Sequence, residues 1–302
     1  MTDHKNVFLI LDAGGTFFKS AVMNKDGLVL EGSSFTTESH SDGTKEEALN
    51  ALKKTIDKGL SFIKDAGLVT SDIGICIPGP FDYNKGVSLM EHKYKCLKGV
   101  DLRSFIYQAT DIPSSTNIIF RHDVNSLVAG EQWKGNAAGY KNIAVLTLGT
   151  GLGFSFSINN IIQCNEIGGP LISMYKKPYR NGILEDYVSK RGISELYNAI
   201  SGLEADIEIV EIANLAQGGN KQAIETFEEV SRIIAENLEE ILTEKQIECL
   251  LFGGQISRSF KFMEHILRNR LENIRSLEKI STVSSIDHSA LLGVLNAILT
   301  KE

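Results

Sequence analysis

The chain repeats one local pattern, a strand followed by a glycine turn and a second strand, at two places far apart in the sequence. The first copy reads VFLILD, AGG and TFFKSAVM, followed by the turn NKDG and by a third predicted strand, LVLEGSSF, at 28–35. The second copy reads IAVLTL, GTG and LGFSFSI, followed by NN and IIQC. Apolar segments interrupted by glycine and asparagine turns are typical of β-hairpins. The repetition predicts two halves of similar architecture, although the two copies share few identical residues.

Each copy is followed by segments that predict helices and further strands. A capping box from Thr44 to Glu47, with apolar residues at helical spacing after it, predicts a helix that runs to about Gly67. The run IECLLFGG is almost continuously apolar, which favours a central strand that is buried on both faces. The other predicted elements are strands at 72–78 and 117–120 and helices at 102–109, 221–243 and 287–299. This succession of strands and helices predicts an α/β fold.

The composition limits the class of protein. With 302 residues, of which 42% are hydrophobic and 23% charged, the chain is long enough for a large core and for two domains. Its net charge of -7 argues against a nucleic-acid partner, which usually requires a basic face. The first ten residues do not form a leader, and no apolar run approaches the ~18 residues of a membrane helix. We therefore expect a cytoplasmic protein with no membrane partner.

The four cysteines are widely scattered along the chain. None of them forms a C-x-x-C pair, the spacing that indicates a zinc site or a redox pair. Reduced, partly buried thiols are the simpler interpretation.

The stretch LDAGGTFFKS lies close in pattern to the phosphate loop G-x-x-x-x-G-K-[ST] but does not match it. That loop requires glycine directly before the lysine, and this chain has Phe18 there. Gly14 and Gly15 are instead interpreted as a hairpin turn, whose backbone N–H groups can approach an anion without an intervening side chain. A tight turn with no ligand is the alternative. The second turn, at Gly149, favours a pair of turns that grips a polyphosphate from two sides.

A carboxylate beside the first turn predicts a metal ion. Asp12 can hold a hydrated magnesium ion near the phosphates, because Mg²⁺ keeps several waters and needs one or two carboxylates. Thr16 and Lys19 can add a hydroxyl and an ammonium donor. A third glycine pair, Gly253 and Gly254, follows a predicted strand directly, where a nucleotide can lie on exposed backbone.

Three further carboxylates are candidates for the chemistry. Asp123, in RHDVN, lies at the end of a predicted strand, in the crevice zone of an α/β sheet. It can act as a helix N-cap, or as a general base that takes a hydroxyl proton during attack on a γ-phosphate. Glu166 and Glu185 follow the second hairpin, one in a loop and one early in a predicted helix. Either can be a solvated surface residue, or both can bind a polyhydroxylated ligand.

The chain carries, in order, LDAGGTFFKSAV, IGICIPGPFD, HDVNSLVAGE, LTLGTGLGFSFS, LLFGGQIS and SALLGVLNA. This order is similar to the motif order of the repressor, open reading frame and kinase (ROK) family, whose sugar kinases belong to the actin-like ATPase superfamily. The resemblance runs from about residue 7 to residue 298. It implies a duplicated ribonuclease-H-like fold, two domains around a central cleft, ATP and magnesium as cofactors, and a homodimer. The implied domains are 1–118 plus 288–302, with the first phosphate motif, and 119–287, with the catalytic aspartate, second phosphate motif and adenosine motif.

The resemblance also implies roles for single residues. The segment from Asp12 through Lys19 resembles the family's first phosphate segment, and the second corresponds to Gly149, Thr150, Gly151 and Gly153. Gly253 and Gly254 are similar to the adenosine motif, and Asp123 resembles the base that activates the sugar hydroxyl. The implied sugar-binding positions are Gly79, His122, Asp123, Glu166 and Glu185.

The chain departs from the family pattern at two places. The family usually has asparagine before the catalytic aspartate, and here the residue is His122, a larger side chain with different donors. The family's G-E-x-G-H loop supplies a histidine that touches the sugar and ligates zinc, and here Gly169 occupies that place. The cysteine-rich zinc segment after it is replaced by ISMYKKPYRNGILEDY. We therefore expect no structural zinc and a sugar that analogy cannot name.

Three functions follow from these patterns. The first is an ATP-dependent hexose kinase, with glucose or an unusual hexose or amino-sugar derivative such as an N-acetylhexosamine as substrate. The second is a sugar-responsive transcriptional regulator, which is disfavoured because eleven residues precede Asp12 and the chain is acidic. The third is a sugar-binding protein that has lost catalysis, suggested by His122 and by the missing zinc segment.

Overall fold

The computed structural model describes residues 5–91, 93–204 and 207–301, and the chain divides into two compact units. Unit 1 comprises Met1–Trp133, Cys164–Gly169 and Asp287–Glu302, and unit 2 comprises Lys134–Gln163 and Pro170–Ile286. The sequence-based boundary after residue 118 differs from this division, because the segment with Asp123 lies in unit 1. The physical reason is strand pairing: β7 (Ile118–His122) pairs in parallel with β4 (Val69–Ile77) and forms one edge of the sheet of unit 1.

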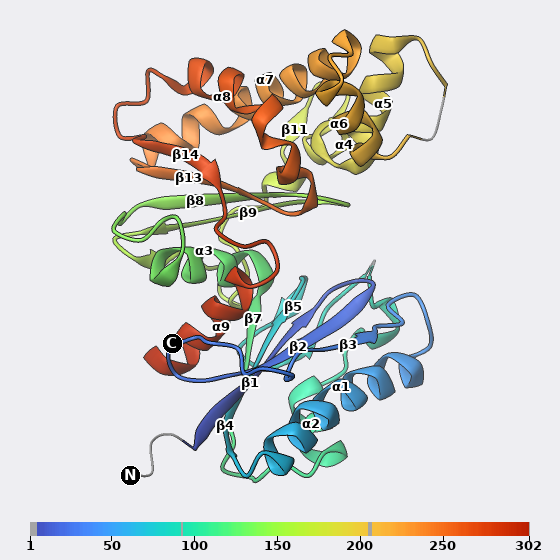
Figure 1. The fold of residues 1–302 in the computed structure, drawn as a ribbon, viewed down its shortest axis with the longest axis vertical. Helices are drawn as coiled ribbons and strands as arrows, with labels where there is room; N and C mark the ends of the chain where they lie inside the picture. Colours follow the sequence, from blue (N-terminus) through green and yellow to red (C-terminus); the bar gives the residue numbers. More distant parts are fainter. Residues whose placement is uncertain (1–4, 92, 205–206, 302) are drawn as a thin grey trace. The chain divides into compact units, whose positions relative to one another are not determined.

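Unit 1 is built on a five-stranded sheet of order β3-β2-β1-β4-β7 (Figure 1). The first three strands are antiparallel, whereas β4 and β7 run parallel to β1. Their bounds are β1 Asn6–Ala13, β2 Phe17–Met23 and β3 Phe35–Glu38. The two-stranded sheet of unit 1 contains β5 Phe81–Asp82 and β6 Val87–Ser88. The helices are α1 Lys45–Asp65, the 3₁₀ helix η1 Lys95–Leu97, α2 Leu102–Ala109, α3 Asp123–Lys134 and α9 Ser289–Thr300.

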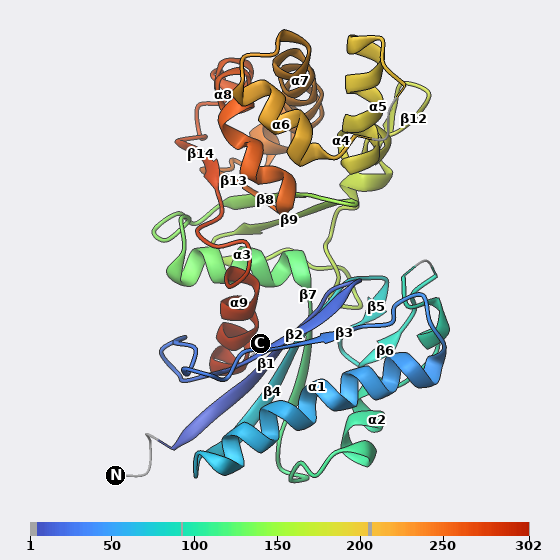
Figure 2. The same ribbon diagram turned by 45° about the vertical axis from the view of Figure 1, so that its right-hand side comes forward.

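The two faces of this sheet are buried by helices from opposite ends of the sequence. Side chains alternate across a strand, so Leu9 and Leu11 of β1 point to the face that α1 covers (Figure 2). Phe8 and Ile10 point to the other face, where they pack against α9. A continuous strand buried on both faces explains why the first strand is apolar at every position from Val7 to Leu11.

Unit 2 repeats the sheet of unit 1. Its strands have the order β10-β9-β8-β13-β14, with the first three antiparallel and the last two parallel to β8. The bounds are β8 Ile143–Leu148, β9 Leu152–Ile158, β10 Ile161–Ile162, β13 Cys249–Gly253 and β14 Lys279–Thr282. The predicted duplication is therefore confirmed, and IECLLFGG forms the buried strand β13 between β8 and β14.

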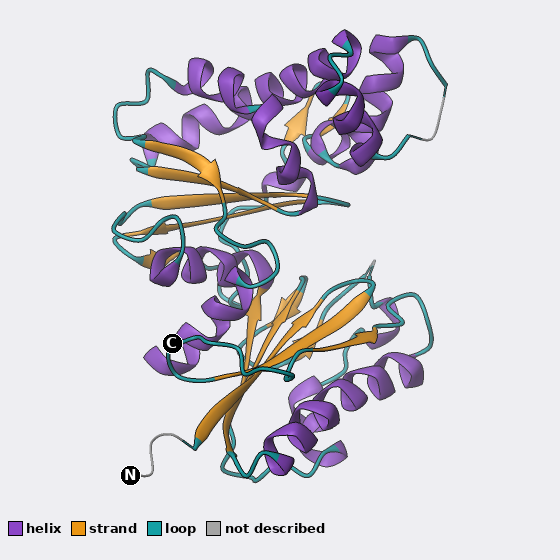
Figure 3. Cartoon of the chain, viewed as in Figure 1, coloured by secondary structure: helices purple, strands orange, loops and turns teal. Residues whose placement is uncertain are grey.

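Helices gather over one face of this second sheet, as Figure 3 shows in purple. They are the 3₁₀ helix η2 Met174–Lys176, α4 Glu185–Val188, α5 Lys190–Ser201, α6 Ile209–Gln217, α7 Lys221–Glu244, the 3₁₀ helix η3 Gln255–Phe262 and α8 Glu264–Leu271. A short hairpin of β11 Pro178–Tyr179 and β12 Gly182–Ile183 precedes α4. Their apolar side chains form one core with Leu146, Phe154 and Phe252 of the sheet.

The long predicted helices are confirmed. Thr44 and Glu47 make the expected reciprocal capping box at the start of α1. The strand predicted at 28–35 is wrong, because Gly32 takes a left-handed backbone conformation and the Ser33 hydroxyl folds back onto the Leu30 carbonyl. The third strand therefore begins at Phe35. No helix in the described ranges is long and apolar enough to cross a membrane.

Candidate active site

The first glycine turn joins β1 to β2 in unit 1, as predicted. Asp12 and Lys19 stand opposite each other across the two strands, and Gly14, Gly15 and Thr16 form the turn between them. The Ser39 hydroxyl donates to the Gly15 carbonyl at 2.7 Å. The backbone N–H of Ser39 donates to the Thr16 carbonyl at 2.9 Å. The turn is thus held through its carbonyl groups.

Asp12 lies at the end of β1, where three carboxylates influence one another. Burial, and secondly the charge of Asp123, raise the pKa of Asp12 to about 6, and Asp287 adds to this effect while Lys19 opposes it. The Lys19 ammonium is already paired with Asp287, at 2.9 Å between Nζ and Oδ1. The site therefore has an excess of negative charge around Asp12, which a divalent cation would neutralise.

Asp123 is the first residue of α3, directly after β7. Burial by itself would raise the pKa of Asp123. The pKa is nevertheless lowered, by the charge and hydrogen bond of His122, by the backbone N–H of Val124 and by the charge of Lys93. His122 Nδ1 lies 2.8 Å from Asp123 Oδ1, and the Val124 N–H donates to the same oxygen at 2.7 Å. The side chain of Asp123 is still 42% exposed. An ionised carboxylate is thus held in a fixed position where a ligand hydroxyl can reach it.

Gly79 lies beside the ring of His122, on the side away from Asp123. A Cβ atom on Gly79 would stand 3.4 Å from His122 Cδ2, 3.6 Å from Nε2 and 3.3 Å from the hydroxyl oxygen of Tyr83. The Tyr83 hydroxyl donates to the Ile77 carbonyl, and its ring contacts that of His122 at 5.8 Å between centroids. Tyr83 therefore fixes His122 from one side while Asp123 fixes it from the other.

The loop with Glu166 is folded onto unit 1 by backbone hydrogen bonds. The Glu166 carbonyl accepts from the side-chain amide of Asn84 at 3.0 Å, and the Ile167 carbonyl accepts from the Tyr83 N–H at 2.9 Å. Asn165 accepts from the backbone N–H of Gly169 at 3.0 Å. Gly169, which replaces the family's histidine, thus ends a compact turn. Tyr83, whose ring contacts His122, also bonds to Ile167, the residue that follows Glu166.

In unit 2 the second glycine turn joins β8 to β9 and is capped by Glu185. The Glu185 carboxylate, from the first turn of α4, accepts from the Leu152 N–H at 2.8 Å. A Cβ atom on Gly151 would stand 2.8 Å from the same oxygen. Gly149 donates its N–H to the Gly151 carbonyl, Thr150 is exposed, and Gly153 pairs with Thr147 in the sheet. Glu185, expected to contact sugar, therefore lies on the second phosphate turn.

The third glycine pair lies beside this turn within unit 2. Gly253 ends β13, and Gly254 adopts a left-handed conformation at φ +77° before η3 begins. A side chain at Gly254 would collide with the Leu148 carbonyl, directly before Gly149. The predicted adenosine motif and the predicted second phosphate motif are thus backbone neighbours.

Two residues that the sequence analysis missed support the first turn. Tyr94 is buried, donates its hydroxyl to the Gly14 carbonyl at 2.6 Å and stacks on Phe18 with ring planes 2° apart. Lys93, directly before it, places its side chain against Gly15. In the sequence both belong to the polar segment EHKYK, which gives no periodicity or motif signal.

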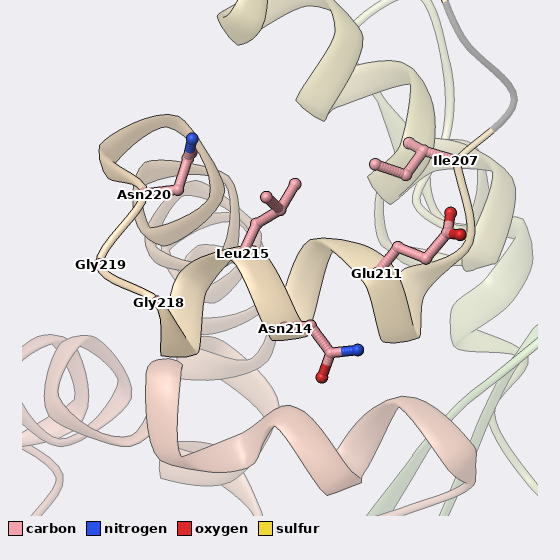
Figure 4. A pocket seen from close by; sticks show the side chains of 7 residues that line it. All are labelled: Ile207, Glu211, Asn214, Leu215, Gly218, Gly219 and Asn220. Carbon is pink, nitrogen blue, oxygen red and sulfur yellow. The ribbon is translucent and has the colours of Figure 1, made fainter.

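A separate hollow opens on unit 2 between α6 and the start of α7, with a volume of about 830 Å³ (Figure 4). It is lined by Ile207, Glu211, Asn214, Leu215, Gly218, Gly219 and Asn220. None of the predicted site residues lines it. The helix α6, which lines the hollow, packs against η3, and η3 begins directly after Gly254 of the predicted adenosine motif.

The described residues contain no group of three or more His, Cys, Asp or Glu side chains that could hold a metal ion by themselves. This finding leaves the expected lack of zinc a prediction. It is compatible with magnesium at Asp12, because Mg²⁺ usually takes few protein ligands and completes its shell with water and phosphate oxygens.

Two sheets of identical strand order, each with a glycine turn after its first strand, define a duplicated ribonuclease-H-like fold of the actin-like ATPase class. The chain belongs to the ROK family, whose model matches residues 8–301. It is 23% identical to a glucokinase from Thermotoga maritima, over 86% of each chain. It is 22% identical to an N-acetyl-D-glucosamine kinase from Haemophilus influenzae, over 95% of this chain and 96% of that one.

Solved structures agree on the fold. A ROK family glucokinase from Streptomyces griseus in complex with glucose and AMPPNP has a TM-score of 0.76 at 19% identity, covering 96% of this chain and 98% of that chain. A ROK family transcriptional regulator, a homologue of the E. coli MLC protein, has a TM-score of 0.84 at 17% identity, covering 99% of this chain and 81% of that chain. The family thus spans kinases and regulators on one scaffold.

Proposed function

We propose that this protein is a sugar kinase that transfers the γ-phosphate of ATP to a hydroxyl group of a hexose or hexose derivative. The observation that carries the proposal is Asp123, an ionised and accessible carboxylate fixed by His122 and Val124 at the head of α3. Asp12 and the first glycine turn lie in the same unit. The kinase names of the full-length relatives support the same reaction.

In the proposed reaction Asp123 accepts the proton of the sugar hydroxyl while that oxygen attacks the γ-phosphorus in line. The bond from the γ-phosphorus to the β,γ-bridging oxygen breaks, and ADP leaves. The backbone N–H groups at Gly14, Gly15 and Gly151 bind phosphate oxygens, with the hydroxyls of Thr16 and Thr150 as further donors. Gly149, whose N–H bonds to the Gly151 carbonyl, borders the phosphates without a side chain. Gly153, on β9 next to the second turn, adds no side chain beside the phosphates, and Gly253 and Gly254 border the nucleoside. Lys19 needs to release Asp287 if it is to bind phosphate, because the two are paired.

Asp12 fits a hydrated magnesium ion. Its pKa is raised to about 6 by burial and by Asp123, so its ionised form lacks a compensating charge. Magnesium supplies that charge and neutralises the phosphate oxygens when MgATP is bound. The role of Asp12 is to orient the ion through water, and Asp123 remains the base.

In unit 1 the groups proposed to bind the sugar are Asp123, the backbone at Gly79, the Nε2 side of His122 and the carboxylate of Glu166. In unit 2 the proposed sugar-binding group is the carboxylate of Glu185. Glu185 also caps the second phosphate turn through the Leu152 N–H, so it would connect sugar binding to phosphate binding. Because Gly169 offers no side chain where the family has a sugar-binding histidine, an N-acetylhexosamine or another non-glucose sugar is the alternative substrate. The H. influenzae relative supports that alternative.

A coupled ADP-release assay tests the proposal directly. The purified protein is given MgATP and a panel of hexoses, hexosamines and N-acetylhexosamines, and turnover above the sugar-free rate is expected with at least one of them. A mass shift of one phosphoryl group in the sugar product confirms transfer rather than ATP hydrolysis. Absence of turnover with every sugar would contradict the kinase proposal.

A catalytically weak sugar-binding regulator is the second candidate, and the likeness to the ROK transcriptional regulator favours it. The two candidates differ in one measurement. A thermal-shift screen detects sugar binding whether the protein is a kinase or a regulator, because a ligand of the native state raises the Tm. A sugar that stabilises the protein but is not phosphorylated in the presence of MgATP would favour the regulator.

We also propose that the protein works in the cytoplasm as a homodimer, without nucleic-acid or membrane partners and without structural zinc. Light scattering coupled to size exclusion tests the dimer, and fractionation of cells tests the compartment. Elemental analysis of the purified protein tests the zinc. Less than about 0.1 zinc per chain is expected, because a structural site would be close to fully loaded.

A further inference from the structure

Lys93 lies against the first glycine turn. A Cβ atom on Gly15 would stand 3.3 Å from Lys93 Cδ, 3.5 Å from Cε and 3.6 Å from Nζ. Because Gly15 has no side chain, the end of the Lys93 side chain can lie over the turn at this position. The same ammonium is one of the charges that lower the pKa of Asp123. One cation therefore acts on both the phosphate turn and the proposed base.

The position of Lys93 is set by the residue that follows it. Tyr94 is buried at 1% exposure and takes a left-handed backbone conformation at φ +52°, which is uncommon for a residue with a side chain. Its hydroxyl donates to the Gly14 carbonyl, its N–H donates to the Ser41 carbonyl, and its ring stacks on Phe18. The segment therefore cannot move without breaking the contacts of the turn itself.

Lys93 is the available cation at this turn, whereas Lys19 is engaged. The Lys19 ammonium is paired with the Asp287 carboxylate, at 2.9 Å between Nζ and Oδ1. Within the described part of the chain, Lys93 has no ion-pair partner, and the side chain is exposed. An exposed ammonium held over a glycine turn can bind a phosphate oxygen as a point charge, and no carboxylate has to release it first.

We infer that Lys93 binds a non-bridging oxygen of the phosphoryl group in transfer and stabilises the charge that builds there. The inference rests on the proposed kinase function. The sugar oxygen forms its bond to phosphorus, the bond to the ADP oxygen breaks, and the hydroxyl proton goes to Asp123. Lys93 stays protonated throughout and gives up no proton. A positive charge that is already in place where negative charge develops lowers the barrier without reorganisation.

Steady-state kinetics of Lys93→Met, with Lys95→Met as the matched control, test the role. Met keeps the length and apolar stem of lysine and removes the charge, and Lys95 is an exposed lysine two residues away on η1. We expect kcat to fall by about 100-fold in Lys93→Met, in the range found for loss of one transition-state donor. The KM for sugar should change less than about 3-fold. Lys93→Arg should recover part of the rate because it restores the charge.

Binding measurements separate this inference from the kinase proposal, since they need no turnover. Calorimetry with AMPPNP and with ADP, each with magnesium, gives the contribution of the γ-phosphate to affinity. Lys93→Met should weaken AMPPNP binding about 10-fold or more while leaving ADP within about 2-fold, as expected for one charge-assisted contact. Lys95→Met should leave both unchanged.

The possible results test the kinase proposal and the role of Lys93 separately. A wild-type protein that binds AMPPNP but phosphorylates no sugar refutes the kinase proposal, and the AMPPNP-to-ADP comparison still decides whether Lys93 contacts the γ-phosphate. Equal loss of AMPPNP and ADP affinity in Lys93→Met would overturn the inference. So would a kcat within about 3-fold of wild type, for a variant whose Tm shows that it is folded.

Discussion

Asp123, the proposed base, is held in place by His122, whose Nδ1 lies 2.8 Å from Asp123 Oδ1. Asp123→Asn keeps the oxygen that accepts the Val124 N–H at 2.7 Å but cannot take a proton. We expect kcat to fall by about 10²- to 10⁴-fold, the range for loss of a general base, with sugar affinity within about 3-fold. Single-turnover assays and calorimetry with the same sugar measure the two quantities. An unchanged rate would mean that another group is the base.

Asp12 gives a prediction about stability and pH. Its pKa in the folded protein, about 6, lies above the ordinary value of 3.8, so the ionised form is disfavoured by folding. The fold therefore loses stability through this group as pH rises from about 4 through 6, and the penalty is fully present above that range. In the absence of ligand and magnesium, Asp12→Asn removes this stability penalty, because the amide does not ionise. The variant should be more stable than wild type by about 3 kcal/mol at pH 8 and about 1.5 kcal/mol at pH 5.

Denaturant titrations at both pH values measure that difference, with Asp42→Asn as a control at an exposed loop position. Magnesium should reduce the gain of Asp12→Asn, because the ion neutralises the wild-type carboxylate. A gain that is the same at pH 5 and pH 8 would show that the shift in pKa does not exist.

The contact between α3 and α9 depends on two glycines that face each other. A Cβ atom on Gly293 would overlap the carbonyl of Ser126, and one on Gly130 would overlap the carbonyl of Ser289. Gly293→Ala must therefore push the helices apart, at a cost of about 2 kcal/mol or more. Gly218→Ala is the matched control, because its new Cβ would have no neighbour closer than 3.4 Å. Thermal and urea unfolding compare them, and equal stability would contradict the close crossing.

Helices and hairpin turns could be predicted from the sequence, whereas contacts between distant residues could not. Hairpin turns, capping residues and apolar periodicity are local signals, so both glycine turns and the helices α1, α7 and α9 were predictable. The segment at 28–35 was not, because Val29 and Leu30 look like strand residues while Gly32 and Ser33 turn the chain. Lys93 was missed because its proposed role comes from its proximity to Gly15, far away in sequence, and no local pattern encodes that proximity. The motif order predicted a sugar-binding role for Glu185, which stays a prediction, but its hydrogen bond with the Leu152 N–H joins residues 33 positions apart and has no local sequence signal.

Unit 1 is assembled from three segments of the chain, and its last helix closes one face of its sheet. Val294 of α9 is fully buried against the strands, whereas Leu299 of the same helix is 39% exposed. Val294→Asp places a carboxylate in that apolar layer, which costs several kcal/mol out of a total stability of about 5–15 kcal/mol. Leu299→Asp should be nearly neutral. We expect Val294→Asp to melt at a much lower temperature or to be recovered unfolded.

Hydrogen exchange measures which strands lose stability in Val294→Asp. β1 and β4 contact α9, whereas β8 and β13 belong to the separate core of unit 2. If each unit holds its own core, a Val294→Asp protein that remains soluble should lose amide protection first in β1 and β4, with β8 and β13 protected to higher denaturant. Simultaneous loss in both sheets would mean that the two units unfold as one cooperative body. In that case a ligand bound to either unit would stabilise the whole chain, and the thermal-shift screen would report on both.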